Sequence, residues 1–392
     1  MSLVSQIEAF TEDLTAIRQD FHAHPELGFE ERRTAGIVAA KLREFGVDEV
    51  HEGIGGTGVI GLVRGAGGGN RRVGLRADMD ALPIQEVSGV PYSSTNPGRM
   101  HACGHDGHTT MLLGAARYLA ETRNFDGTVV LIFQPAEEGL GGARRMLAEG
   151  LFERFPCDEI YGMHNDPGAD PGVVTVTPGP AMAGAAFFDI VVKGCGSHAA
   201  MPHQSKDPIV IGTALVQQLQ SVVSRNTPPT KPVVLSVTTF NAGSAYNVVP
   251  GSATITGTIR YFHDDVIAIA ETRMRELCAG LAQAYGVEIT VELRNVFDVL
   301  LNDADLSDAY VAAAADVVGD GARISDSQMT GSEDFADMLK VVPGAYCRVG
   351  HAGSVPLHNP AFVLDDAILP VGAAVYARIV ETRLPAGGPA AS

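Results

Sequence analysis

Apolar and polar residues follow a helical spacing at the start of the chain. The segments 7–27 and 34–46 carry apolar residues every three or four positions, and Gly46 supplies a C-terminal stop for the second segment. Short apolar runs typical of strands come next, with helical stretches at about 108–122 and 140–150 between some of them; these runs are 58–65, 71–78, 128–134 and 159–164. Two helices followed by alternating strands and helices predict an α/β fold with a largely parallel sheet.

The pattern changes between Ala185 and Phe297. There the order is strand, helix, strand, strand, helix, strand, which is the order of a ferredoxin-like α+β unit. A helix at about 306–318, a strand at 345–350 and a final helix ending near Arg383 then return to the first pattern. We therefore expect a discontinuous main domain, residues 1–184 and 298–392, interrupted by an inserted domain at 185–297.

Length and charge narrow the class of protein. A chain of 392 residues is longer than a single hydrophobic core usually grows, which agrees with two domains. The net charge of −18 would repel phosphate backbones and anionic lipid surfaces, so neither nucleic acid nor a membrane is an expected partner. The N-terminal residues lack a basic segment followed by an apolar run, and we expect a cytoplasmic protein.

The densest group of metal-capable side chains is MHACGHDGH at 100–108. It holds three histidines, one cysteine and one aspartate. Five cysteines at irregular spacing do not suggest a disulfide framework, so Cys103 is either a metal ligand or a buried residue. Thiolate together with imidazole suits zinc, cobalt, nickel or manganese, whereas the alternative is a polar loop with surface histidines.

Further candidate ligands stand where predicted strands end. Glu137 and Glu138 follow the strand 128–134, in a loop with proline and glycine, and His164 ends the strand 159–164. His351 and His358 come after the strand 345–350. Ligands of α/β proteins gather at the carboxyl ends of strands, and one glutamate of the pair could bind metal while its neighbour takes a proton from the attacking water. Taken singly, each of these residues could equally be a surface or structural group.

Two aspartates lie at the end of the strand 71–78, in the segment RADMDALP. Asp78 is the last residue of this strand, and Asp80 follows it two positions later. We interpret Asp80 as a group that orients a ligand histidine.

Several motifs carry a family resemblance in their order along the chain, from HAHPELGFEE to LHNP: RADMDALP, MHACGHDGH, QPAEEG, HAAMPH, NVVP and GSEDF. With these motifs the chain resembles the aminoacylase and carboxypeptidase G group of dinuclear metallopeptidases, in its hippurate hydrolase and indoleacetyl amino acid hydrolase branch. The resemblance implies a three-layer, zinc-peptidase-like catalytic domain with a mostly parallel mixed sheet, and an inserted ferredoxin-like lid and dimerisation domain.

The resemblance also implies roles for particular residues. Glu137 would be the general base, and two divalent ions per subunit, of manganese, zinc, cobalt or nickel, would share the Cys103 thiolate. The implied metal ligands are Cys103, His105, Glu138, His164 and His358.

The inserted domain is implied to supply further groups. His198 of HAAMPH would reach the partner subunit's site in a homodimer, or in a dimer of dimers, and hydrogen-bond the oxyanion. Asn247 of NVVP and Arg260 would face the substrate, with the Arg260 guanidinium holding a carboxylate in a bidentate manner. A strand-edge surface arginine is the alternative for Arg260.

The chain departs from many relatives outside this branch at Asp78, where those relatives carry a histidine. This leaves the metal geometry open. Asp106 and His108 could replace a ligand, or Asp106 could cap the following helix, and His101 could take either role. None of the four is included among the expected ligands.

Three functions follow from these residues. The leading one is a metal-dependent amidohydrolase that cleaves N-acyl amino acids, with hippurate-like, indoleacetyl or acetyl groups. A dipeptidase or carboxypeptidase on the same site would need a group for a free α-amine, which the sequence does not identify. A non-catalytic protein that binds metal or a small ligand has no use for Glu137 as a base.

Overall fold

The computed structural model describes residues 3–353 and 355–387, and the outer ends of the expected main domain lie outside that range. The chain divides into two compact units. The first comprises residues up to Gly179, residues 301–327 and the residues from Asp334 onward. The second comprises residues 180–300 and 328–333.

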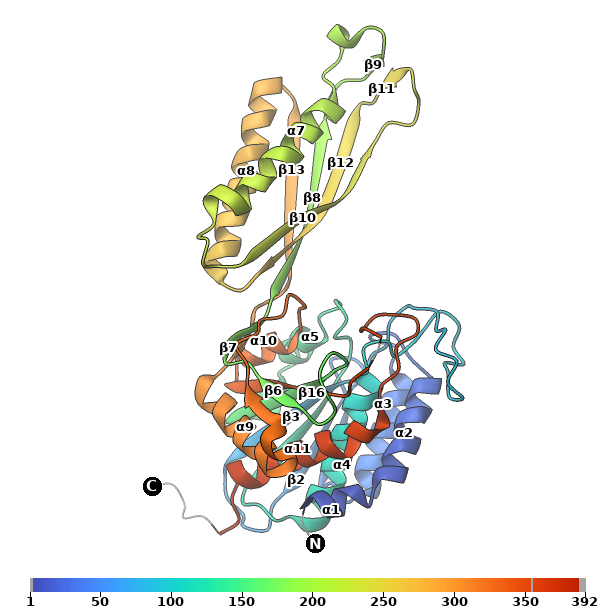
Figure 1. Ribbon diagram of the computed structural model, residues 1–392, viewed down its shortest axis with the longest axis vertical. Coiled ribbons are helices and arrows are strands. Elements are labelled where there is room, and N and C mark those ends of the chain that lie inside the picture. The colour runs from blue at the N-terminus through green and yellow to red at the C-terminus, as the bar shows by residue number, and fades with distance from the viewer. Residues whose placement is uncertain (1–2, 354, 388–392) are drawn as a thin grey trace. The chain divides into compact units, whose positions relative to one another are not determined.

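The first unit is built on an eight-stranded sheet with the order β1-β2-β4-β3-β5-β16-β6-β15 (Figure 1). Its centre, β4-β3-β5-β16, is parallel, while β1 and β2 add antiparallel strands at one edge. The central strands are buried along nearly their whole length, as expected for parallel strands covered on both faces. The strands are β1 (Glu49–Ile54), β2 (Gly58–Arg64), β3 (Arg72–Asp78), β4 (Thr128–Gln134), β5 (Glu159–Asp166), β6 (Val174–Val176), β15 (Ala322–Ile324) and β16 (Gly344–Gly350).

Helices cover this sheet and close its core. The side chains of α4 and α11 are mostly buried, and Leu112, Met163 and Tyr376 belong to one continuous apolar core. The helices are α1 (Leu3–Glu8), α2 (Thr11–Ala23), α3 (Arg32–Glu44), α4 (His105–Thr122), α5 (Gly142–Ala148), α6 (Leu151–Arg154), α9 (Ala304–Val318), α10 (Phe335–Leu339) and α11 (Leu369–Arg383), with short 3-10 turns at η3 (Gly319–Gly321) and η4 (Asp366–Ile368).

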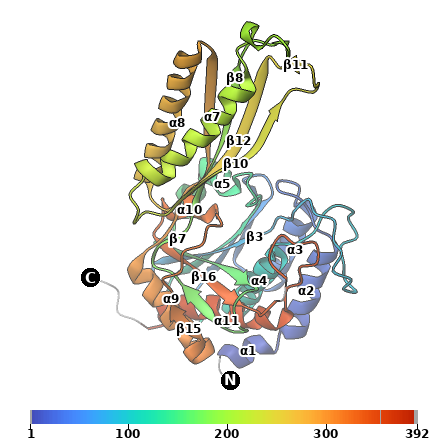
Figure 2. The same cartoon turned by 45° about the horizontal axis from the view of Figure 1, so that its top comes forward.

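The second unit is a four-stranded antiparallel sheet with the order β10-β12-β8-β13. Helices α7 and α8 lie on one face of this sheet, as Figures 1 and 2 both show. Its own core includes Phe188, Leu215, Ile255 and Met274. The elements are β8 (Gly184–Lys193), β9 (Ser197–His198), η1 (Pro202–Gln204), α7 (Pro208–Ser221), η2 (Val222–Asn226), β10 (Val233–Ala242), β11 (Val248–Val249), β12 (Ser252–Tyr261), α8 (Asp264–Tyr285) and β13 (Glu288–Phe297); β7 (Gly179–Met182) and β14 (Leu300–Asn302) stand where the chain crosses between units.

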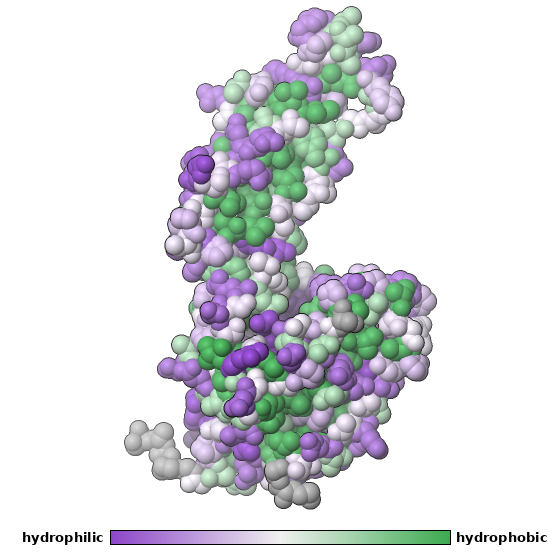
Figure 3. Space-filling view, viewed as in Figure 1, coloured by the Kyte–Doolittle hydropathy of each residue, from purple (hydrophilic) through white to green (hydrophobic). Residues whose placement is uncertain are grey.

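Local sequence explains the ends of the two long helices in this unit. Asp207 caps α7 by accepting a hydrogen bond from the Ile209 backbone N–H, and Pro208 occupies the first helical position. Gly286 ends α8 in the left-handed conformation at φ +62°. Ile209 and Val210 of α7 have exposed side chains, and Figure 3 shows apolar surface interleaved with polar surface on the visible face of this unit.

The structure confirms the expected fold class and corrects some element positions. Three helices rather than two precede the first strand, and that strand is β1 rather than 58–65. The helix expected from about His108 begins at His105. No helix in the described part of the chain is both long and apolar enough to span a bilayer.

Candidate metal centre

Four segments of the first unit bring the predicted ligands to one edge of the sheet. Cys103 precedes α4, and His105 is the first residue of that helix. Glu138 follows β4, His164 lies near the end of β5, and His358 follows β16. Because β4, β5 and β16 are parallel members of one sheet, their carboxyl ends lie on the same side.

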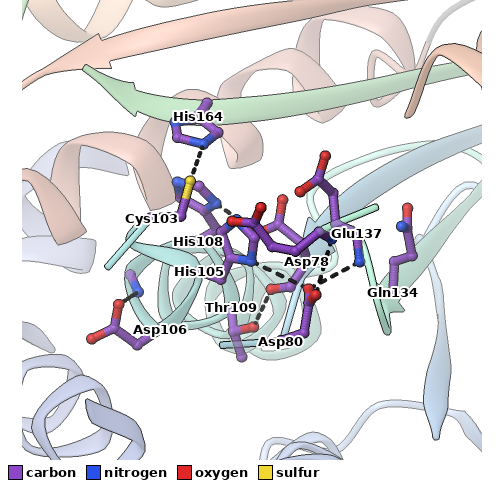
Figure 4. A network of polar contacts seen from close by, with 12 residues as sticks. Asp78, Asp80, Cys103, His105, Asp106, His108, Thr109, Gln134, Glu137 and His164 are labelled. Carbon is purple, nitrogen blue, oxygen red and sulfur yellow. Dashed lines mark hydrogen bonds and ion pairs between the residues drawn. The ribbon is translucent and has the colours of Figure 1, made fainter. Parts of the chain in front are cut away.

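Cys103 stands at the centre of the cluster. Its Sγ lies 3.4 Å from His164 Nε2, the contact drawn in Figure 4, and 3.3 Å from His358 Nε2. Glu138 Oε1 lies 3.3 Å from His358 Nε2 and 3.9 Å from His105 Nε2. The five side chains predicted to be ligands therefore converge on one place.

Glu137 lies at the same place. Its carboxylate has an oxygen within 4.8 Å of ligand atoms of His105 and Glu138. Cys103 similarly groups with His105 and His164, and separately with Glu138 and His358. One thiol thus belongs to two groups of three.

The donor set fits divalent metal ions. His105 Nε2 and Glu138 Oε1 are buried atoms that have no hydrogen-bond partner within the described residues. Buried polar atoms are normally bonded, so these two atoms are arranged for another partner. Thiol, imidazole and carboxylate donors together suit transition-metal ions.

The electrostatics of the cluster also favour a cation. Burial opposes the charged form of His105, but Asp78 and Cys103 nevertheless raise its pKa well above the usual value. The hydrogen bond to Cys103 and the close carboxylate of Glu138 raise the pKa of His358 to about 10. Burial, with a contribution from the nearby His108, holds the pKa of His164 well below its usual value. The carboxylates therefore attract positive charge, while His164 keeps a neutral ring able to bind a metal.

Asp80 connects a ligand ring with the glutamate turn. Its Oδ1 lies 3.3 Å from His105 Nδ1 and accepts a hydrogen bond from the Glu137 N–H at 3.0 Å. Its Oδ2 accepts from the Glu138 N–H at 3.0 Å. Figure 4 shows the Asp80 carboxylate between His105 and Glu137. With Nδ1 facing Asp80, Nε2 of His105 points toward Glu138.

A second buried line of contacts leads to His164. Asp78 Oδ1 lies 2.6 Å from His108 Nδ1, and His108 Nε2 lies 2.7 Å from Asn165 Oδ1. The Asn165 N–H donates to His108 Nε2 at 3.0 Å, and the Asn165 carbonyl lies 2.7 Å from His164 Nδ1. Asp78 and His108 are thus linked to His164 through Asn165.

Asp106 takes neither of the two roles considered for it. Figure 4 shows its carboxylate pointing away from the cluster. Gly104, not Asp106, occupies the N-cap of α4. Asp106 Oδ2 instead lies 2.8 Å from His22 Nδ1 and 3.5 Å from Arg18 Nη1, and His22 Nε2 lies 3.3 Å from Glu86 Oε1.

His101 and His351 are buried beside these networks. Both ring nitrogens of His101 are without a hydrogen-bond partner among residues 3–353 and 355–387, and burial lowers its pKa to about 4. His351 Nε2 lies 3.2 Å from Asn165 Nδ2. Within the same part of the chain, neither histidine enters a group of three metal-capable side chains.

The second unit brings two of its three predicted residues together. His198 of β9 pairs with Val248 of β11, and the Ala199 N–H donates to the Asn247 carbonyl at 3.0 Å. Arg260 pairs with Ala185, toward the opposite end of β12. Burial lowers the pKa of Arg260, and its guanidinium carbon lies 5.9 Å from the Phe187 ring centroid.

Known proteins resemble this chain over nearly its whole length. The sequence pattern of peptidase family M20/M25/M40 matches residues 74–382. A hippurate hydrolase of Campylobacter jejuni is 40% identical over 97% of this chain and 98% of its own length. An IAA-amino acid hydrolase of Arabidopsis thaliana, ILR1-like 2, is 38% identical over 95% of this chain and 85% of its own length. A solved structure of the Bacillus subtilis YXEP protein, described as a dinuclear metal binding peptidase from the M20 family, superposes with a TM-score of 0.84 at 34% identity, covering 97% and 99% of the two chains.

Proposed function

The chain belongs to peptidase family M20/M25/M40, and on this premise we propose that Glu137 is the base of an amide hydrolysis at a two-metal site. The protein is a metal-dependent amidohydrolase of N-acyl amino acids, which releases a carboxylic acid and an amino acid. The family and the reaction class expected from the sequence are thus confirmed. The observation that carries the site assignment is the convergence of five donors beside Glu137. The proposed ligands are Cys103, His105, Glu138, His164 and His358.

Glu137 is placed to move the proton of the reaction. The backbone N–H of Glu137 donates a hydrogen bond to Asp80, which fixes the position of this residue. Because the next residue, Glu138, is a proposed ligand, the Glu137 carboxylate lies beside the metal site. It would accept a proton from the water that attacks the amide carbonyl and deliver that proton to the departing amine. Divalent ions, when bound, would polarise the carbonyl and lower the pKa of the attacking water.

We propose a homodimer in which the partner subunit's His198 donates a hydrogen bond to the oxyanion. His198 lies shortly after the C-terminal end of β8. Arg260 pairs with Ala185, near the N-terminal end of the same strand. A ten-residue strand spans roughly 33 Å, so the two residues serve well-separated places. This separation supports a role for His198 outside its own subunit, while Asn247 would face the substrate. Arg260 would hold the substrate carboxylate.

Several finer assignments remain predictions. Manganese, zinc, cobalt or nickel would occupy the two positions, and the cytoplasm is the expected compartment. Residues 1–184 and 298–392 would carry out catalysis, with 185–297 as the lid and dimerisation domain. The acyl groups proposed are benzoyl, indoleacetyl and acetyl.

A hydrolysis screen tests this function directly. Protein reconstituted with each of the four metals is assayed against N-acetyl, N-benzoyl, N-indoleacetyl and N-lauroyl amino acids and against dipeptides, with Glu137→Gln as the blank. We expect metal-dependent release of amino acid from at least one N-acyl series. Turnover of dipeptides alone would replace the proposal with the dipeptidase reading.

A further inference from the structure

The turn that presents the two glutamates has an unfavourable backbone conformation. Ala136, directly before Glu137, has φ +53° and is completely buried. The left-handed region is unfavourable for a residue with a Cβ, so such a conformation persists only where its surroundings impose it.

Two buried carboxylates bind three consecutive N–H groups of this turn. The Ala136 N–H donates to Glu31 Oε1 at 2.8 Å. The next two, of Glu137 and Glu138, donate to the two oxygens of Asp80 at 3.0 Å each. Hydrogen bonds from N–H groups to carboxylates are stronger than those between neutral groups. Each backbone N–H of the turn from Ala136 to Glu138 is therefore bound by a carboxylate oxygen.

Glu31 is itself fixed in place. It is fully buried at the start of α3, and its Oε2 accepts a hydrogen bond from Thr57 Oγ1 at 2.6 Å. Burial raises the pKa of Glu31 to about 7. Nearby, Gly28 packs so tightly on the turn that a Cβ there would lie 3.0 Å from the Cα of Ala136. Two residues of the segment 28–31, Gly28 and Glu31, therefore pack on the turn.

We infer that Glu31 is a positioning residue, which holds Ala136 in its left-handed conformation and thereby aims Glu137 and Glu138. The inference rests on the proposed function only for the roles of those two glutamates. Without Glu31, the Ala136 N–H would be buried and unpaired, and the turn would relax toward an ordinary backbone conformation. Both the base and one metal ligand would then move.

The test compares Glu31→Ala, Glu31→Gln and Glu26→Ala. Glutamine keeps an oxygen for the Ala136 N–H, so it is the conservative variant. Glu26 is a matched control, because its carboxylate also accepts backbone N–H groups, those of Arg33 and Thr34 at 3.1 and 2.9 Å, without contacting the turn. Measured quantities are zinc affinity by chelator competition, kcat and KM of the zinc-loaded enzyme, and Tm.

We expect Glu31→Ala to weaken zinc binding by about tenfold and to lower kcat by about tenfold or more, with little change in KM. Glu31→Gln should stay within about threefold of the parent in both quantities, because the hydrogen bond is retained. Glu26→Ala should lower Tm only. The inference is overturned if Glu31→Ala changes Tm alone, or if Glu31→Gln is as impaired as Glu31→Ala.

Two arrangements keep the test decisive. If Glu31→Ala does not fold, Glu31→Asp takes its place, since the shorter side chain falls short of the Ala136 N–H; equal zinc affinity and kcat in Glu31→Asp and Glu31→Gln would overturn the inference. Failure of the proposed function appears instead as an inactive zinc-loaded parent. The zinc affinities of the variants then decide the role of Glu31 on their own.

Discussion

His22 and Asp106 form a buried ion pair, with Nδ1 and Oδ2 2.8 Å apart. Burial disfavours the imidazolium and Arg18 repels it, but the hydrogen bonds to Asp106 and Glu86 prevail and raise the pKa of His22 to about 9. His22 is therefore charged at neutral pH and joins α2 to the first turn of α4, next to the ligand His105.

Because of this ion pair, we expect the free energy of unfolding to fall at alkaline pH. A group whose pKa is higher in the folded state stabilises the fold fully below its unfolded pKa, here 6.5, and loses that contribution as the pH rises through about 9. The difference between these two pKa values corresponds to about 3 kcal/mol in the free energy of unfolding. Urea unfolding of metal-free protein between pH 6 and 10 should show this decline. His22→Gln should make the decline smaller by the contribution of His22, leaving that of His105 and His358, whose pKa values are also raised. An unchanged decline in His22→Gln would assign the pH dependence to other groups.

Substitution of the two neighbouring glutamates should separate base from ligand. Glu137→Gln is expected to keep its metal content and Tm but to lose about 10²- to 10⁴-fold in kcat, because the proton acceptor is gone. Glu138→Gln is expected to lose bound metal together with activity. Metal analysis and steady-state kinetics of both variants check this, and full activity in Glu137→Gln would exclude it as the base.

The oxyanion role of His198 has a neighbouring control. His198→Ala should retain the dimer and its metals and lower kcat by about 10²-fold, the scale for losing one oxyanion donor. His203→Ala changes another exposed histidine of the same loop region and should leave kcat unchanged. Kinetics and sedimentation measure the two effects. A change in KM alone would rule out oxyanion stabilisation by His198.

Asn165 should affect metal binding through His164. Asn165→Ala removes the side chain held by His108 and should weaken metal affinity by about 10- to 100-fold, as for other groups that orient ligands. Asn302 is an equally buried asparagine with three hydrogen bonds to backbone atoms, and Asn302→Ala should cost stability alone, about 1–3 kcal/mol. Chelator competition and urea unfolding distinguish the two. Equal metal affinities in the two variants would contradict an orienting role for Asn165.

The sequence predicted that the candidate ligands Glu138, His164 and His358 would lie close together, because each of them ends or follows a recognisable strand. Glu138 and His164 follow or end short apolar runs typical of buried strands, and parallel strands bring such ends together. It also predicted the order of strands and helices in 185–297, since alternating burial along β12 leaves a clear period of two.

The sequence did not reveal groups whose burial depends on tertiary packing. Arg18 and His22 lie on α2, where helical spacing alone places charged residues toward solvent, yet both are buried. Glu31 acts on a turn more than a hundred residues away, and nothing local marks it. The strand β1 was missed because EVHEGI is mostly polar and only partly buried at the edge of its sheet.

The place of β16 in the sheet has a consequence for the growing polypeptide. This strand is the last of its sheet to be synthesised, and it lies between β5 and β6 rather than at an edge. During synthesis, the sheet of the first unit therefore stays incomplete between β5 and β6 until β16 has been made. Residues 180–300 can already fold by then, because they form an almost continuous segment. A chain truncated before β16 would leave the edges of β5 and β6 exposed to other nascent chains, and would lack His358 as well.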